Sequence, residues 1–265
     1  MELIGYFAAI LIGVSLGLIG GGGSILTVPV LVYLFHIDAV VATTYSLFVV
    51  GFTSILGSIS YFTKKLIDVK IAFLFGLPSI VSVFITRIYL LPLIPDKIID
   101  IGSLAISKSI FLMLLFAILM LLASYKMIQK NTNPYEQTQE KKQYNLLQII
   151  LQGLIIGMLT GLVGAGGGFL IIPALVNLLY LPIKKAIGTS LFIISLNSIS
   201  GFLFSLQKIE IDWIFLFTIT SIAAIGIFIG SFLSSKIDGK KLKPAFGWFV
   251  LVMGIFILLK EIYLK

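Results

Sequence analysis

The stretch GLIGGGGSILTVPVLV, residues 17–32, decides how this chain folds. Four consecutive glycines, 20–23, interrupt a run that is otherwise almost wholly apolar. Glycine destabilises a helix interior by roughly 0.5–1 kcal/mol, and unpaired backbone is costly in lipid. A closely similar stretch, GLVGAGGGFLIIPALV, recurs at residues 161–176. A break that is repeated in the same apolar context indicates that both breaks serve the fold or the function.

The composition identifies an integral membrane protein. Of the 265 residues, 59% are hydrophobic and 11% are charged, with a mean hydropathy of +1.14. A soluble domain usually carries about 25% charged residues. The net charge of +8 sits mainly in short loops between apolar segments, so we relate it to membrane orientation and expect no nucleic-acid partner. The absence of cysteine excludes disulfides, thiolate metal sites and a cysteine nucleophile.

Two of the apolar runs are too long for one crossing, because a span needs about 20 residues. Each of the two contains a glycine cluster, so we predict two helical hairpins with glycine tips. The predicted fold is all-α and membrane-integral, with two inverted repeats, each a glycine-tipped hairpin plus three transmembrane helices. The predicted parts are repeat 1 over 1–125 (hairpin 3–35, spans 40–62, 69–94 and 104–125), a cytoplasmic linker over 126–145, and repeat 2 over 146–265 (hairpin 146–182, spans 186–207, 213–235 and 244–260).

The two halves match each other without a gap when the sequence is shifted by 144 residues. Gly17 then falls on Gly161, Pro29 on Pro173, and the SLF at 46–48 on the SLF at 190–192. Apolar sequence often matches itself by chance, but coincident glycine, proline, serine, lysine and aspartate positions make chance a poor explanation. We therefore interpret the chain as two homologous halves.

The loop charges indicate that the halves are inverted. The loop at 36–38 has no lysine or arginine, whereas its counterpart contains Lys184 and Lys185. Lysines are retained on the cytoplasmic side, so we place 63–70, 126–145, 180–186 and 236–243 inside and both termini outside. A parallel arrangement with four crossings per half is the alternative, and it loses this asymmetry. The charges do not tell whether the hairpin arms span the membrane fully.

The glycine tips are our candidate binding site. A helix that restarts inside the membrane offers unpaired N–H groups and a partial positive charge to an anion. We expect helices to restart near Ser24 and near Phe169, and the two ends to form a symmetric cradle for an oxyanion. Helix packing is the alternative, and we assign it to the pairs Gly13/Gly17, Gly157/Gly161 and Gly226/Gly230. The tip candidates are Gly20, Gly21, Gly22, Gly23 and Ser24 in the first half, and Gly164, Ala165, Gly166, Gly167, Gly168 and Phe169 in the second.

Polar residues inside the following spans add further candidates. Hydroxyl and amide donors suit a sulfonate or carboxylate, and inter-helix hydrogen bonding is the alternative role. These candidates are Thr44, Ser46, Thr189, Ser190 and Asn197. Arg87 lies near the outer end of its span, where it either attracts an anion into an outer vestibule or extends to the headgroups. We find no paired carboxylates or histidine at depth, and expect neither an enzyme nor a metal or cofactor.

The doubled glycine motif, each followed by a helix containing SLF, resembles the TauE/SafE sulfite exporter family, also called the toluene sulfonate uptake permease family. The resemblance covers both halves. It implies a bacterial or organellar inner-membrane carrier for sulfite, organosulfonates or related small organic anions, and it fixes neither the substrate nor the direction. Ala165 departs from the pattern, since Gly21 is its counterpart. The exchange costs little if Ala165 has helical or extended dihedrals.

We therefore expect a multi-pass transporter of the bacterial inner membrane that moves a small sulfur oxyanion by alternating access around a midplane site. An anion channel, or a carrier of another organic anion or of an amino acid, is the alternative. The expected partners are the anion and the lipid bilayer, and a homodimer is left open.

Overall fold

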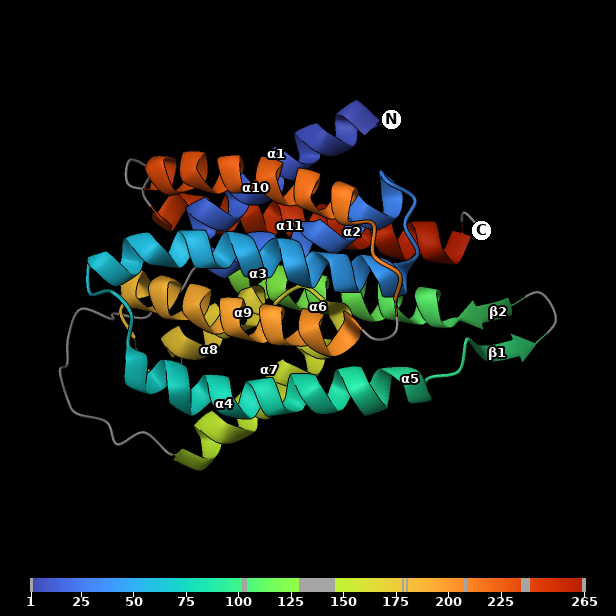
Figure 1. Cartoon of the computed structure of the whole chain (residues 1–265), viewed down its shortest axis with the longest axis horizontal. Coiled ribbons are helices and arrows are strands. Elements are labelled where there is room, and N and C mark those ends of the chain that lie inside the picture. Colours follow the sequence, from blue (N-terminus) through green and yellow to red (C-terminus); the bar gives the residue numbers. More distant parts are fainter. Residues whose placement is uncertain are drawn as a thin grey trace.

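Figure 1 shows the computed structural model of the chain, a bundle of helices with one small β-hairpin projecting from it. The structure describes residues 2–101, 104–128, 146–177, 179, 181–206, 209–234 and 239–263, and the structural statements below concern these residues. Most of the predicted linker, 129–145, lies outside them, as do Lys208 and Lys236.

Each half contains a helix, a glycine break and a short second helix, followed by longer helices. The first half consists of α1 (Glu2–Ile19), the 3₁₀-helix η1 (Gly20–Leu26), α2 (Thr27–Tyr33), α3 (Ala39–Thr63), α4 (Val69–Ile85), the π-helical turn η2 (Thr86–Leu90), α5 (Leu91–Leu93), β1 (Lys97–Ile101), β2 (Leu104–Ser107) and α6 (Lys108–Ile128). The second half consists of α7 (Leu146–Val163), α8 (Gly168–Asn177), α9 (Ile183–Ser205), α10 (Trp213–Ser234) and α11 (Gly239–Tyr263).

Within the described residues, six helices are long and apolar enough to cross a membrane. They are Ala39–Thr63, Val69–Leu93, Lys108–Tyr125, Leu146–Val163, Ile183–Ser205 and Trp213–Leu233. The predicted last span, 244–260, lies within α11. α2 and α8 have only 7 and 10 residues, whereas a full crossing takes about 20. The returning arm of each predicted hairpin therefore contains an α-helix that is too short to span alone.

The fold is mostly helical, as predicted, with one exception in the described residues. The loop expected around Asp96 and Lys97 contains an antiparallel β-hairpin, in which Lys97 pairs with Ser107 and Ile101 with Leu104. This hairpin projects from one end of the bundle (Figure 1). Isoleucines are frequent in this stretch, and β-branched residues favour extended backbone. The span predicted to begin at 104 consequently begins at Lys108.

The helices of the two halves interlock. α1 packs against α10, and the equivalent helices of the other half, α7 and α4, pack against each other in the same way. α3 packs against its own equivalent α9, and α6 against α11. Each of these four pairs combines one helix from each half, so neither half forms a separate lobe.

Glycines allow the interlocked helices to approach closely. A Cβ added to Gly13 would overlap the carbonyl oxygen of Ala223 in α10, and a Cβ on Gly157 would overlap that of Ser79 in α4. Gly157 and Ser79 are the positions that the shift of 144 assigns to Gly13 and Ala223. Gly17, Gly161, Gly226 and Gly230 are in similarly close contact. Helix packing, as predicted for these three glycine pairs, is therefore confirmed.

The equivalent helices α3 and α9 run antiparallel. Gly51 of α3 lies against Ile199, and Gly57, further along α3, lies against Leu191, which is earlier in α9. Figure 1 shows the two chain ends and the β-hairpin at one end of the bundle. The turn between α3 and α4 and the start of α9 lie at the opposite end.

Matching aspartates begin the helices α4 and α10. The side chain of Asp68 accepts a hydrogen bond from the N–H of Ile71, and that of Asp212 accepts one from Phe215. The backbone N–H of Asp68 donates to Thr189 Oγ1 at 2.9 Å, and that of Asp212 donates to Tyr45 Oη at 2.7 Å. Thr189 and Tyr45 are equivalent positions, so this contact between the halves also occurs twice.

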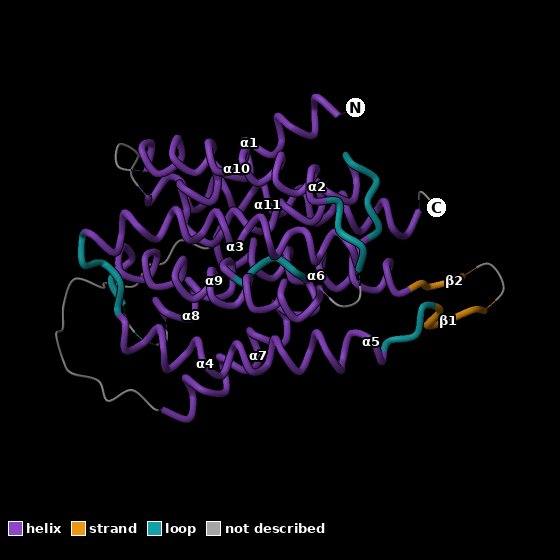
Figure 2. The backbone as a smooth tube through the Cα atoms, viewed as in Figure 1, coloured by secondary structure: helices purple, strands orange, loops and turns teal. Residues whose placement is uncertain are grey.

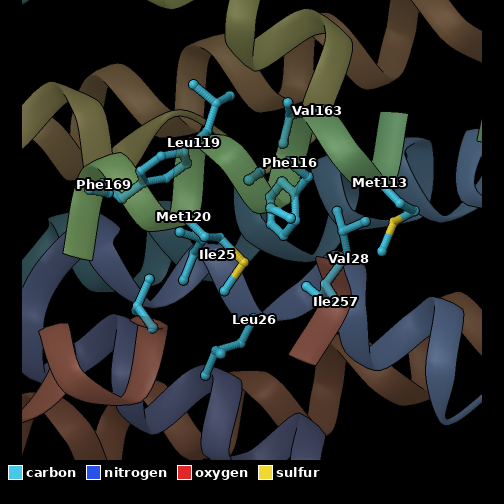
Figure 3. Close-up of a cluster of buried hydrophobic side chains, with 14 of the residues drawn as sticks. Ile25, Leu26, Val28, Met113, Phe116, Leu119, Met120, Val163, Phe169 and Ile257 are labelled. Carbon is cyan, nitrogen blue, oxygen red and sulfur yellow. The ribbon is translucent and has the colours of Figure 1, made fainter. Parts of the chain in front are cut away.

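The outer surface of the bundle is apolar, as a lipid environment requires. Large side chains such as Leu77, Ile155, Ile214 and Phe228 are more than half exposed. Inside, the apolar residues of both glycine tips share one cluster with α6 and α11 (Figure 3). That cluster includes Ile25 and Leu26 of η1, Phe169 of α8, and Phe116 and Met120 of α6. The apolar side chains of both tips therefore pack against α6 and α11.

Candidate functional site

The first glycine tip is a continuous 3₁₀-helix. Gly20 has a left-handed φ of +70°, and the chain then runs helically to Leu26. Ser24 Oγ donates to the carbonyl of Gly21 at 2.8 Å, and the N–H of Thr27 donates to the carbonyl of Ser24. The α-helix α2 begins at Thr27, three residues after the predicted helix restart near Ser24, and one apolar helix extends from Gly23 to Tyr33. Because η1 follows α1 directly, the helical turns of this tip are continuous.

The second tip is an open turn in the middle of the bundle (Figure 2). Gly164, Gly166 and Gly167 have φ values of +75°, +67° and +72°, a conformation that side chains with a Cβ rarely adopt. α8 then begins at Gly168, close to the predicted restart near Phe169. The N–H groups of Leu170 and Ile171 both donate to the carbonyl of Gly167 at 2.9 Å, which closes the first turn of α8.

Ala165 does not require glycine's freedom. The non-glycine residues with positive φ in the described part of the chain are His36 and Lys65. Ala165 is therefore not left-handed, and its exchange with Gly21 is accommodated as predicted.

The two tips contact each other through their backbones. A Cβ on Gly21 would overlap the side chain of Ile194 and lie 2.5 Å from Gly168 Cα, and a Cβ on Gly168 would overlap the backbone of Gly21. The structure thus brings the two predicted half-sites together. The small hollow beside the second tip, lined in part by Thr160 and Ala165, has no room for a water molecule.

Arg87 is buried beside the second tip. Its side chain is 2% exposed, so the interpretation that it extends to the headgroups is wrong. Its Nη1 donates to Thr43 Oγ1 at 3.2 Å and to Thr44 Oγ1 at 3.3 Å, and its Nη2 donates to the carbonyl of Thr43 at 3.5 Å. Nε has no hydrogen-bond partner. A Cβ on Gly164 would overlap the carbonyl of the same Thr43, so α3 links the guanidinium to the second tip.

A local irregularity positions Arg87. It lies in η2, the π-helical turn that follows α4. Such a turn contains one extra residue, which shifts the side chains around the helix axis, and π-turns are frequent at functional sites. The equivalent helix α10 continues as an ordinary α-helix through Ser231, the counterpart of Arg87.

Arg87 is the only charged residue among the buried residues that the structure describes. Its hydrogen-bond partners are two hydroxyls and one carbonyl, all neutral. A buried charge is costly unless it is paired, and intramembrane charges generally mark a pathway for substrate or ions. The arrangement favours binding of a negatively charged group.

The other predicted polar residues separate into two groups. Thr44 Oγ1 accepts a hydrogen bond from the guanidinium of Arg87. Ser46 Oγ is buried without a hydrogen-bond partner. Asn197 Nδ2 donates to Ser79 Oγ at 2.7 Å, and Asn197 Oδ1 has no partner. Thr189 and Ser190 already have hydrogen-bond partners. Thr189 accepts from the N–H of Asp68 at the start of α4, a contact between helices as in the alternative role considered for it. Ser190 donates to the carbonyl of Ile187 within its own helix α9.

Several buried hydroxyls were not among the predicted site residues. Thr27, Ser54, Thr160 and Ser198 have side-chain oxygens without a partner. A Cβ on Gly166 would lie 2.8 Å from Ser198 Oγ, and one on Gly167 would overlap Thr160 Oγ1. An unpaired buried hydroxyl costs about 1–3 kcal/mol, which a ligand oxygen would offset. The repeat match gave a signal for Ser54 and Ser198, which are equivalent serines in apolar spans.

Predicted tip residues differ in what they can offer. Phe169 packs its ring into the apolar cluster (Figure 3), so its backbone N–H is the group available to a ligand. Gly20 and Gly23 are packed against Ile187 and Ser15 respectively. Gly22 lies within η1. The residues around the second tip that have free polar groups, Arg87, Thr160 and Ser198, therefore form the candidate site together with Thr43 and Thr44.

Comparisons with known proteins agree with this membrane architecture. Residues 6–257 match the family described as "Sulfite exporter TauE/SafE". The chain is 27% identical over 260 residues to "Probable membrane transporter protein YunE" of Bacillus subtilis, which covers 91% of this chain and 89% of that protein. It is 30% identical over 263 residues to a probable membrane transporter protein of Methanocaldococcus jannaschii, covering 94% and 92% of the two chains. No solved structure gives a significant match.

Proposed function

Since the chain belongs to the sulfite exporter TauE/SafE family and is a multi-pass membrane protein with transporter relatives, we propose that it is a secondary transporter of a small sulfur oxyanion such as sulfite or a sulfonate. The observation that carries the proposal is Arg87, a buried cation bonded only to neutral groups. A bound oxyanion would neutralise it.

The surroundings of Arg87 suit an oxyanion in further respects. Arg87 Nε–H is a free donor, and a guanidinium matches the geometry of oxygen pairs on an anion. Thr160 and Ser198 supply hydroxyls without partners. The first turn of α8 adds N–H groups and the positive end of a helix dipole. These groups border the second tip, where the hollow has no room for a water molecule, so an oxyanion would bind them once the tips move apart.

Alternating access between inverted halves is the mechanism that we propose. The antiparallel course of the equivalent helices α3 and α9 supports inversion, and inverted repeats with interrupted helices are common in secondary transporters. The tips touch where the halves interlock, so relative movement of the halves would open the second tip to either side. Lysine-rich loops retained inside would leave both termini outside, in a bacterial inner membrane.

Replacing Arg87 tests the proposed anion site. The purified protein is reconstituted into vesicles, and uptake of radiolabelled sulfite and methanesulfonate is measured for the wild type and Arg87→Met. Removing one partner of a buried charge interaction costs about 2–5 kcal/mol, so we expect uptake by Arg87→Met to fall at least about thirtyfold. Arg87→Lys should retain part of the uptake, and Lys184→Met, at an exposed end, should retain all of it. Full uptake by Arg87→Met would contradict the proposal.

A counterflow measurement separates a carrier from an anion channel. Vesicles loaded with unlabelled methanesulfonate should take up labelled substrate faster than empty vesicles if the protein is a carrier. Equal initial rates would favour a channel.

Single cysteines test the inverted orientation, because the chain has none of its own. Asp38→Cys and Lys184→Cys place one cysteine in each of two equivalent loops. In intact cells, an impermeant maleimide should label position 38 and spare position 184. Labelling of both positions from outside would contradict inversion.

A further inference from the structure

The buried charges of the protein set the charge that a ligand at the tips can carry. Arg87 is the one charged side chain among the buried residues described. The remaining polar groups around the second tip, Thr43, Thr44, Thr160 and Ser198, are all neutral. Lys64, which follows α3, and Lys184, in the first turn of α9, are exposed. One positive charge is therefore available at the site.

The equivalent position in the other half carries no second cation. Ser231 of α10 occupies the place that corresponds to Arg87. Ile187 and Gly188 correspond to the two threonines that hold the guanidinium, and Ile187 lies against Gly20 of the first tip. A ligand held between the tips would thus meet a guanidinium on one side and neutral or apolar groups on the other.

From this asymmetry we infer that the site around Arg87 selects monovalent oxyanions and discriminates against dianions of similar size and shape. A single negative charge would be neutralised by the guanidinium, and its other oxygens would accept from neutral hydroxyls and N–H groups. The second charge of a dianion would be buried without a partner, which is strongly unfavourable in a low-dielectric interior. The inference rests on the proposed function, and it names the charge of the substrate.

Two matched pairs of anions test this inference. Methanesulfonate and sulfate share a tetrahedral sulfur but carry one and two charges, and ethanesulfonate and ethane-1,2-disulfonate differ in the same way. Affinity for the purified full-length protein is measured by thermal shift over a range of ligand concentrations. We expect each monoanion to bind at least about a hundredfold more tightly than its dianion, the ratio that a difference of about 2.7 kcal/mol gives.

The possible results are distinguishable. Dianions that bind within about tenfold of the monoanions, a gap of only about 1.4 kcal/mol, would overturn the inference while leaving an anion carrier intact. Absence of binding by all four anions would overturn the proposed function together with the inference. Arg87→Lys, which keeps the charge, should keep the preference for monoanions, whereas Arg87→Met should bind the monoanions at least about thirtyfold more weakly.

Sulfite provides an internal control, because it changes from a monoanion to a dianion near neutral pH. Affinity for total sulfite should decrease as the pH rises, whereas affinity for methanesulfonate, a monoanion throughout, should remain constant. Affinity for sulfite that is unchanged or increases with pH would overturn the inference.

Discussion

The two glycine tips have nearly the same sequence and different structures. The first is a 3₁₀-helix in which Gly20 is the left-handed glycine among the described residues. Gly20 lies against the side chain of Ile187. The second is an open turn with three left-handed glycines, next to Thr43, Thr160 and Ser198. The repeat thus preserves the break in each half, while the groups around each break differ.

The difference arises from the partner helices rather than from the tips. The shift of 144 exchanges Thr43 with Ile187 and Arg87 with Ser231. A buried charge and its threonine partners consequently lie at the second tip, whereas Ile187 lies at the first. A duplicated scaffold of this kind can carry one asymmetric site, which means that a symmetric cradle for the anion, as the sequence led us to expect, is not needed.

The largest difference between the tips should follow from adding a methyl group at Gly164 and at its equivalent Gly20. Both glycines are left-handed, so each alanine costs about 1–2 kcal/mol for its backbone alone. At Gly164 the methyl would also overlap the carbonyl of Thr43, whereas at Gly20 it meets the movable side chain of Ile187. We expect Gly164→Ala to lower vesicle uptake at least about a hundredfold more than Gly20→Ala, a difference of about 2.7 kcal/mol.

Uptake is normalised to the amount of reconstituted protein, so that poorer expression does not count as lost transport. Equal losses of uptake in the two variants would show that the two tips contribute equally to transport, which would contradict the proposed difference between them.

An intermediate difference should follow from changing the partner helices. Thr43→Val keeps the shape of the side chain and removes the hydroxyl that accepts from Arg87. A hydrogen bond to a charged group contributes about 1.5–3 kcal/mol, so we expect KM for methanesulfonate to rise by about ten- to a hundredfold. Ile187→Val, the matched change at the first tip, should leave KM nearly unchanged. Similar KM changes in both variants would argue against a special role for Thr43.

The smallest difference concerns the two equivalent serines. Ser54 and Ser198 both have buried hydroxyls without a partner, so alanine at either position should leave the thermal stability unchanged or slightly raise it. Ser198 borders the second tip at Gly166, and we expect Ser198→Ala to raise KM about three- to tenfold, or roughly 0.7–1.4 kcal/mol. Ser54→Ala is the control. A larger KM change for Ser54→Ala than for Ser198→Ala would indicate that the substrate does not bind at the second tip.

The sequence predicts the helices and the breaks well, because long apolar runs and glycine clusters are local signals. It also predicts the close packing at Gly13 and Gly157, since small residues repeated on one helix face allow close approach. The β-hairpin escapes prediction because its isoleucines continue into the apolar run of the next span. The difference between a 3₁₀-helix and an open turn is likewise not visible in two nearly identical motifs.

The surroundings of Arg87 could not be predicted for a different reason. In a helix that is apolar all round, periodicity does not indicate which face is buried. The π-helical turn further changes the direction of the side chain. The contact of Arg87 with Thr43, and of Thr43 with Gly164, joins three segments that are far apart in the sequence. Only the tertiary structure brings the charge to the second tip.

The position of a bound anion tests the central claim most directly. Crystals of the full-length protein are grown with 2-bromoethanesulfonate, and the bromine is located by anomalous diffraction. We expect one site per chain at the second tip, with a sulfonate oxygen about 3 Å from the guanidinium of Arg87. An ordered anion beside Gly20 and Ile187 instead, or anions only on exposed lysines, would contradict it.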